Sequence, residues 1–131
     1  MRTLIVEDDF ISRRILKDIL SSHGDCDIAI DGKEAVQAFR MALDENKPYE
    51  LICMDIMMPN MDGQEALKKI REIEKERGIT GSREVKVIMT TALDDPKNVV
   101  EAYYKGGATS YVVKPINKGR LLGEIRGFGL L

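Results

Sequence analysis

The chain has 131 residues with a formal net charge of −2, and hydrophobic residues make up 44% of it. We therefore expect a single domain over residues 1–131 that buries a core. The near balance of acids and bases argues against a nucleic-acid partner, and the absence of a long apolar run or signal peptide argues for a cytoplasmic protein with no membrane partner.

The two cysteines and the single histidine do not predict a disulfide or a metal site. Cys26 and Cys53 each lie within an apolar segment, where a cysteine usually serves as a small buried hydrophobe. His23 has no second histidine or paired cysteine at metal-ligand spacing. We expect none of these three side chains to carry the chemistry.

Strand and helix patterns alternate along the chain. An apolar run at residues 3–6 predicts a buried strand, and apolar residues at helical spacing over 11–20 predict the helix after it. Further strands are expected at residues 26–30, 51–54, 87–89 and 111–113, and the helices that follow them at 35–43, 66–73, 99–104 and 121–125. Residues 51–54 are the most apolar strand and are expected at the centre of the sheet.

Two of these segments mix apolar and polar residues. In residues 26–30, Cys26, Ile28 and Ile30 alternate with Asp27 and Ala29, which is typical of a half-exposed edge strand. In the third helix, charged residues opposite the apolar stripe predict a solvated face, made up of Lys68, Lys69, Arg71, Glu72, Lys75 and Glu76.

Strands that alternate with helices predict an α/β fold, with a doubly wound five-stranded parallel sheet and five helices on its two faces. Right-handed crossovers leave few topologies for such a sheet. Ligands of these folds bind beyond the carboxyl ends of the strands. The residues that end the strands are therefore the first candidates for a functional site.

Polar residues with complementary chemistry end four of the expected strands: Glu7, Asp8 and Asp9; Asp55; Thr90 and Thr91; and Lys114 with Pro115. In a parallel sheet all of them meet at one edge. Crowded carboxylates repel one another unless a cation is present, and an oxygen-only ligand set is typical of Mg²⁺. The lysine and hydroxyl beside them indicate an anionic partner such as a phosphoryl group.

Some of these residues also have simpler interpretations. An acidic residue after a strand often caps the next helix, and Asp9 or Ser12 suits that role, as Asp62 does for the third helix. Lys114 lies in an apolar stretch, where a lysine usually needs an anionic partner. The loop methionines suggest either a pliable binding surface or loop packing, of which we favour packing; they are Met57, Met58 and Met61.

Taken together, these segments resemble the receiver domains of bacterial two-component response regulators, and chemotaxis response regulators in particular. The resemblance extends from Leu4 to Ile125. The matching segments are Leu4-Ile5-Val6-Glu7-Asp8, Met54-Asp55-Ile56-Met57-Met58-Pro59-Asn60-Met61-Asp62-Gly63, Thr91-Ala92 and Tyr111-Val112-Val113-Lys114-Pro115. The resemblance implies a flavodoxin-like sheet with strand order 2-1-3-4-5.

The resemblance also implies a role for each acidic residue at the strand ends. Asp55 would accept a phosphoryl group from the phosphohistidine of a sensor histidine kinase. Glu7, Asp8 and Asp55 would hold Mg²⁺ together with the backbone carbonyl of Met57, and Asp9 would lie outside the site. The chain would catalyse only its own phosphorylation and slow dephosphorylation.

The remaining matched residues would bind and report the phosphoryl group. Thr91 and Lys114 would bind its oxygens, and Tyr111 would turn inward as Thr91 moves. The bond before Pro115 is expected to be cis. The face formed by residues 99–104 and 111–125 would then bind a downstream protein, which the sequence does not identify.

Two apolar residues flank the expected path of the water that hydrolyses the phosphoryl adduct. In the family these positions lie two residues beyond the acceptor and two beyond the threonine; here they are Met57 and Leu93. Neither side chain orients water, so we expect a longer-lived adduct than in relatives with polar residues there.

Three other functions fit the chain less well. A flavodoxin-type electron carrier needs a phosphate-binding loop rich in Ser, Thr or Gly after the first strand, where this chain has acids. A phosphatase of the haloacid dehalogenase type needs a second Asp two residues after Asp55, where this chain has Met57. An unphosphorylated, purely structural receiver would not need the complete acceptor set.

Overall fold

The computed structural model describes residues 1–92, 97 and 107–131. Its strands pair in parallel in the order β2-β1-β3-β4-β5. They are β1 (Thr3–Val6), β2 (Cys26–Ala29), β3 (Leu51–Asp55), β4 (Lys86–Thr91) and β5 (Ser110–Val113). The expected fold class, strand order and central strand are confirmed.

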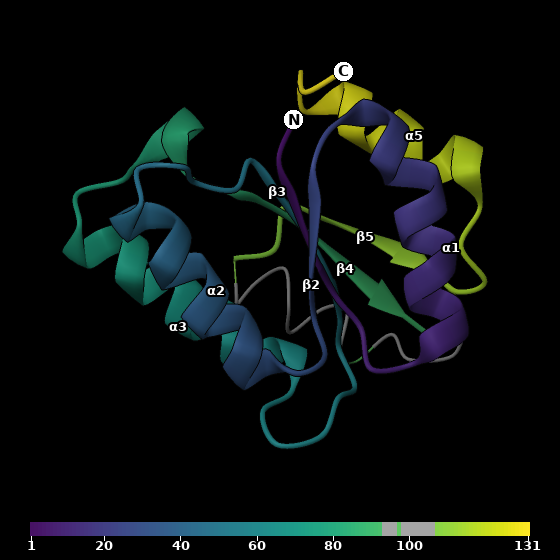
Figure 1. Ribbon diagram of the computed structural model, residues 1–131, viewed down its shortest axis with the longest axis horizontal. Helices are drawn as coiled ribbons and strands as arrows, with labels where there is room; N and C mark the ends of the chain where they lie inside the picture. The colour runs from purple at the N-terminus through teal and green to yellow at the C-terminus, as the bar shows by residue number, and fades with distance from the viewer. Residues whose placement is uncertain (93–96, 98–106) are drawn as a thin grey trace.

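Helices cover both faces of this sheet (Figure 1). One face carries α1 (Phe10–Leu20) and α5 (Lys118–Gly127), and the other carries α2 (Gly32–Asp44) and α3 (Gly63–Glu76). Two short 3-10 helices, η1 (Ser21–His23) and η2 (Gly81–Arg83), complete the described elements. The helix expected over residues 99–104 lies outside the described residues.

The core has two halves because successive strand residues point to opposite faces. Leu4 and Val6 of β1 pack with the residues of α2 and α3, whereas Ile5 packs with those of α1 and α5. Every residue of β3 is buried, as befits a strand with helices on both sides. Cys53 lies in this buried strand and Cys26 is half-buried, and both thiols are free.

Each described α-helix begins at a side chain that caps its first turn. The capping oxygens accept the backbone N–H three residues on, which satisfies a donor that the helix itself leaves unpaired. The caps are Asp9 on Ser12, Asp31 on Glu34, Asp62 on Glu65 and Asn117 on Arg120. The capping expected of Asp9 and Asp62 is confirmed.

The edge of the sheet at β2 is more exposed than the apolar alternation predicts. Ala29 is the buried residue of β2, while Ile28 and Ile30 are 39% and 48% exposed. The small Ala29 packs into the core half beneath α2, whereas Ile28 lies at the rim of α1, in a shallow hollow that it shares with Phe10. A helix covers the middle of a sheet better than its edge strand, which leaves these isoleucines in contact with solvent.

The charged side of α3 is also not wholly solvated. Arg71 donates hydrogen bonds to the carbonyls of Val85 and Gly107 and pairs with Glu74 at 2.6 Å. Glu74 is 1% exposed, and its second oxygen accepts the Val85 N–H at 2.7 Å. The prediction of a solvated face is therefore wrong for Arg71, which fastens α3 to the start of β4.

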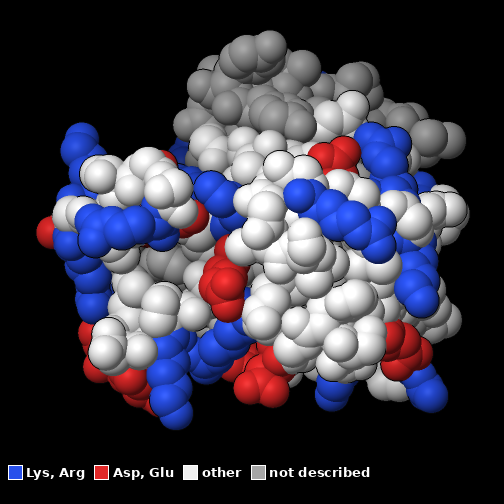
Figure 2. Space-filling model, turned by 90° about the horizontal axis from the view of Figure 1, so that it is seen from above, with Lys and Arg blue, Asp and Glu red and all other residues white. Residues whose placement is uncertain are grey.

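The surface seen from above carries charges of both signs (Figure 2). Groups of Lys and Arg side chains alternate there with Asp and Glu, without one continuous field of either sign. None of the described helices has both the length and the apolar character that crossing a membrane requires.

Candidate functional site

The carboxyl ends of neighbouring strands bring the expected acids together. Val6 at the end of β1 pairs with Met54 of β3, so Glu7 follows β1 where Asp55 ends β3. On the other side, Asp55 pairs with Thr90, and Thr91 pairs with Val113. The parallel register thus places the residues at the carboxyl ends of β1, β3, β4 and β5 along one edge of the sheet.

Lys114 joins two of these acids. Its Nζ lies 3.0 Å and 3.3 Å from the two carboxylate oxygens of Glu7 and 3.1 Å from Oδ2 of Asp55. Glu7 has no exposed surface and Asp55 is 7% exposed. The other oxygen of Asp55, Oδ1, accepts the backbone N–H of Met57 at 3.2 Å. The anionic partner expected of Lys114 is therefore a pair of buried carboxylates.

Crowding and burial change the proton affinity of this cluster. Burial, reinforced by the nearby charge of Asp55, raises the pKa of Glu7 to about 7 from its ordinary 4.5, although Lys114 opposes the shift. Burial alone would lower the pKa of Lys114, but hydrogen bonding to Glu7 and the negative charge of Asp55 outweigh it and raise that pKa. The lysine is thus held charged between two acids.

The acids at this edge form a group that can hold a metal ion. Glu7, Asp8 and Asp55 each offer one carboxylate oxygen within 4.8 Å of the others. Glu7 and Asp55 are buried and Asp8 is exposed, so the group opens to solvent on one side. With Lys114 charged and all three acids ionised, two negative charges remain, which one Mg²⁺ would cancel. An all-oxygen, carboxylate set fits Mg²⁺, which retains several waters when it binds.

Asp9 lies at the same strand end but has a different role. It is exposed, and its Oδ2 accepts the Ser12 N–H at 2.9 Å as the N-cap of α1. This hydrogen bond is the main reason that the pKa of Asp9 lies below its ordinary value. Of the three consecutive acids, only Glu7 and Asp8 join the carboxylate group with Asp55.

The other matched residues lie in β4, in β5 and directly after β5. Thr91 is buried at the end of β4, and its hydroxyl donates to the carbonyl of Ala92 at 3.4 Å. Tyr111 of β5 pairs with Met89 and is half-buried against the core half that contains α2 and α3. The peptide bond between Lys114 and Pro115 is cis.

The loop after Asp55 has one exposed and two packed methionines. Met58 and Met61 pack against the core, as expected of them, whereas Met57 is 66% exposed, so the packing prediction is wrong for Met57. Leu93, the other residue expected to exclude water, lies outside the described residues. The exclusion of water by Met57 and Leu93 therefore stays a prediction.

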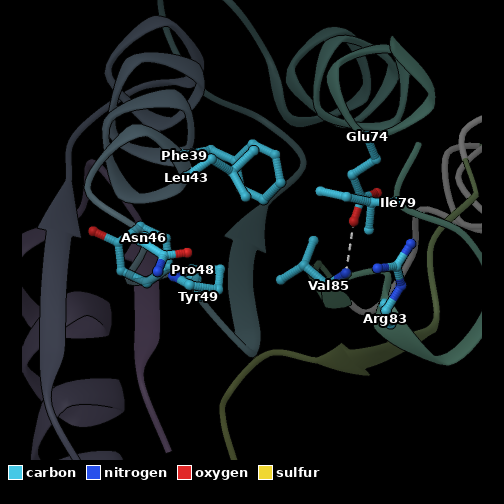
Figure 3. A pocket seen from close by; sticks show the side chains of 9 residues that line it. All are labelled: Phe39, Leu43, Asn46, Pro48, Tyr49, Glu74, Ile79, Arg83 and Val85. Carbon is cyan, nitrogen blue, oxygen red and sulfur yellow. Dashed lines mark hydrogen bonds between the residues drawn. The ribbon is translucent and has the colours of Figure 1, made fainter. Parts of the chain in front are cut away.

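A separate pocket lies at the other end of the strands (Figure 3). It encloses about 290 Å³ between the last turns of α2 and α3, and Phe39, Leu43, Ile79 and Val85 give it apolar walls. Its buried acid, Glu74, is already bound to Arg71 and to the Val85 N–H. Val85 precedes β4, whereas Thr91 ends it, so this pocket is remote from the carboxylate group.

Comparison with known proteins defines the class to which this fold and site belong. The family model of the response regulator receiver domain matches residues 3–126. The chain therefore belongs to the response regulator receiver domain family, whose members are signalling proteins rather than metabolic enzymes.

Individual relatives agree with this assignment. The chain is 35% identical over 126 residues to the chemotaxis protein CheY of Bacillus subtilis, a match that covers 95% of this chain and 93% of that protein. It is also 35% identical to hybrid signal transduction histidine kinase I of Dictyostelium discoideum, but there the match spans 7% of the longer protein.

Two solved complexes contain similar domains. The first joins the receiver domain of the Saccharomyces cerevisiae response regulator Ssk1 to the histidine phosphotransfer protein Ypd1; the similarity has a TM-score of 0.83 at 30% identity and covers 98% of this chain and 88% of that one. The second is the CheX-CheY-BeF₃-Mg complex of Borrelia burgdorferi, with a TM-score of 0.80 at 28% identity, covering 97% of this chain and 87% of that one.

Proposed function

We propose that residues 1–131 form one phosphoacceptor domain, in which Asp55 takes a phosphoryl group from a phosphohistidine in a Mg²⁺-dependent reaction. The observation that carries this proposal is the contact of Lys114 Nζ with Asp55 Oδ2, at 3.1 Å, beside a group of three carboxylates. A carboxylate that is both paired with an ammonium and next to a metal-binding group is suited to attack an anionic phosphoryl group.

In the proposed reaction a carboxylate oxygen of Asp55 forms a new bond to phosphorus while the bond from phosphorus to the donor imidazole breaks. The imidazole nitrogen keeps the electron pair and takes up a proton. Bound Mg²⁺ would supply positive charge to the oxygens of the transferring group. Glu7, Asp8 and Asp55 would hold the ion, with the backbone carbonyl of Met57 as a further ligand.

Lys114 and Thr91 would stabilise the product. The Lys114 ammonium already contacts Asp55, so a phosphoryl group added there gains a cation without a large movement of the lysine. The Thr91 hydroxyl makes a long, 3.4 Å contact with the carbonyl of Ala92, which a phosphoryl oxygen can replace. Movement of Thr91 would then allow Tyr111 to turn inward and alter the face that binds a downstream protein.

The solved complexes of similar domains support the kind of partner protein that we propose for this chain. The receiver domain of Ssk1 was solved with a histidine phosphotransfer protein, and CheY of Borrelia burgdorferi was solved with CheX, BeF₃ and Mg. We propose a sensor histidine kinase as the donor for this chain and an as yet unidentified protein as its target. The cytoplasmic location, the lack of nucleic-acid and membrane partners, and the restriction of catalysis to the domain's own phosphorylation and slow dephosphorylation stay predictions.

Incubation with acetyl phosphate tests the proposal. We expect one phosphoryl group to be added in the presence of Mg²⁺ and none after chelation of the metal. Asp8→Ala should weaken Mg²⁺ binding and block labelling, whereas the matched variant Asp9→Ala should retain both and lose about 1 kcal/mol of stability with its helix cap. Metal-independent labelling, or a requirement for Asp9 instead of Asp8, would overturn the assignment.

A further inference from the structure

The loop between β3 and α3 is fastened to the start of α2. In this loop, Asn60 donates from Nδ2 to Oδ2 of Asp31 at 2.9 Å, and the carbonyl of Met61 accepts the Gly32 N–H at 3.0 Å. Two hydrogen bonds thus join segments that lie about thirty residues apart in the sequence. The loop is the segment that contains Met57, the residue whose carbonyl is proposed as a metal ligand.

On the α2 side of this connection, both carboxylate oxygens of Asp31 accept hydrogen bonds. Oδ1 of Asp31 accepts the Glu34 N–H at 2.8 Å as the N-cap of α2, which leaves Oδ2 directed at Asn60. Asp31 is 7% exposed, and its hydrogen bonds to the Glu34 N–H and then to Asn60 hold its pKa below the ordinary value. An ionised, buried carboxylate with both oxygens engaged makes a strong acceptor for the Asn60 amide.

The loop side depends on backbone geometry that few residues adopt. Asn60 has a φ of 66°, in the left-handed region, where asparagine is one of the better tolerated residues. A Cβ on Gly32 would lie 2.4 Å from the carbonyl oxygen of Met61, so the two segments touch through their backbones. At the other end of the loop the Gly63 N–H donates to the carbonyl of Ile56 at 2.8 Å.

We propose that Asp31 and Asn60 are positioning residues for the metal site, which they support by holding the β3–α3 loop against α2. The inference rests on the proposed function, because it concerns the same Mg²⁺ site. A ligand supplied by a loop binds an ion well only when the loop is held in place, and residues that support ligands therefore affect affinity without touching the metal. Asn60 lies three residues after Met57 in this short loop.

Three variants isolate the Asp31–Asn60 hydrogen bond. Asp31→Ser retains a cap for α2 but loses the second acceptor oxygen. Asn60→Gly removes the amide and still allows a positive φ. The exchange Asp31→Asn with Asn60→Asp reverses donor and acceptor, keeps the cap, and leaves the charge of the pair unchanged.

The readout is the dissociation constant of Mg²⁺, measured by calorimetric titration of the unphosphorylated protein. We expect each single variant to bind Mg²⁺ about tenfold more weakly, at the lower end of what loss of a ligand-supporting residue costs. The variant that combines Asp31→Ser with Asn60→Gly should bind no more weakly than either single variant. The exchanged pair should recover most of the affinity.

Tyr49→Phe is the control for a general loss of stability. It removes the hydrogen bond from the Tyr49 hydroxyl to Asp27, a 2.7 Å contact near the opposite end of the sheet, and should lower the unfolding temperature with no effect on Mg²⁺ affinity. Unchanged affinity in both single variants, or no recovery in the exchanged pair, would overturn the positioning role alone. Failure of the wild-type protein to bind Mg²⁺ would overturn the proposed function as well.

Discussion

Glu7 is a carboxylate with no exposed surface, held between the ammonium of Lys114 and the carboxylate of Asp55. Burial and the neighbouring acid favour its protonated form, whereas Lys114 favours its ionised form. The balance raises the pKa of Glu7 to about 7, so this side chain changes charge close to neutral pH. Without a bound metal ion, Glu7 therefore carries a negative charge at alkaline pH that its buried surroundings disfavour.

The raised pKa of Glu7 predicts that the stability of the metal-free protein depends on pH. Between its ordinary pKa of 4.5 and the folded value of about 7, Glu7 binds a proton in the folded protein that it has lost in the unfolded chain. Its contribution to the free energy of unfolding must therefore fall as pH rises through this window. Glu7→Gln removes this titrating group and serves as the reference. Over this pH window the free energy of unfolding of the metal-free wild type should fall relative to that of Glu7→Gln, by on the order of a few kcal/mol, because one pKa unit corresponds to about 1.4 kcal/mol.

Urea unfolding of both proteins with a chelator present measures this difference. The free energy of unfolding of wild type minus that of Glu7→Gln should decline from about pH 4.5 to about pH 7, the ordinary and the folded pKa of Glu7, and should be constant above that range. Parallel pH profiles for wild type and Glu7→Gln would contradict the raised pKa of Glu7.

The sequence predicts the identity of the residues at the site better than their contacts. Strand ends and charge type are sufficient to single out Asp55, Lys114 and the acidic run from Glu7 to Asp9, because parallel strands place their carboxyl ends together. Within that run, the family resemblance selects Glu7 and Asp8. The direct contact of Lys114 with both acids depends on the register and the burial of the side chains. The contact of Asp31 with Asn60 could not be predicted from the sequence, because it joins two segments that only the packing of α2 beside α3 brings together.

At the scale of elements, the start of α3 lies directly against the strand that carries Asp55. A Cβ on Gly63 would lie 2.3 Å from the carbonyl oxygen of Asp55 and 2.9 Å from Cε of Met89. No rotamer change relieves a clash with a backbone oxygen. The absence of a side chain at Gly63 therefore lets the loop return close to the end of β3.

Two glycine variants test this close approach. Gly63→Ala should lower the free energy of unfolding by about 1–3 kcal/mol, the usual cost of overpacking a filled site. Gly123→Ala, inside α5 with nothing within 4 Å of the added carbon, should raise it by roughly 0.5–1 kcal/mol through helix propensity. Denaturant midpoints measure both. A neutral or stabilising Gly63→Ala would contradict the tight packing of α3 against β3.

The sequence predicts the elements through their periodicity, and its errors occur where packing overrides periodicity. The buried strands stand out because helices cover both of their faces, as β3 shows. At the edge, Ile28 and Ile30 have the apolar character of core residues but lie beyond the cover of α1. Glu74 is the reverse case: a charged helical residue that is buried because Arg71 and the Val85 N–H satisfy its oxygens.

At the scale of the whole molecule, the two ends of the sheet differ in kind. The carboxyl ends of the strands carry the carboxylate group, Lys114 and Thr91, whereas the opposite end carries an apolar pocket whose one buried acid, Glu74, is already paired. Parallel pairing makes this division possible, because every strand contributes its carboxyl end to the same edge. Metal binding and phosphoryl transfer should therefore be confined to one edge of the sheet.

The location of the phosphoryl group tests the central claim most directly. Peptide mapping by mass spectrometry after phosphorylation with acetyl phosphate and Mg²⁺ should find a single acid-stable, base-labile phosphoryl group on Asp55. Asp55→Asn, which preserves the size of the side chain, should carry no label. A phosphoryl group on another residue of the wild-type protein, or undiminished labelling of Asp55→Asn, would contradict the assignment of Asp55 as the acceptor.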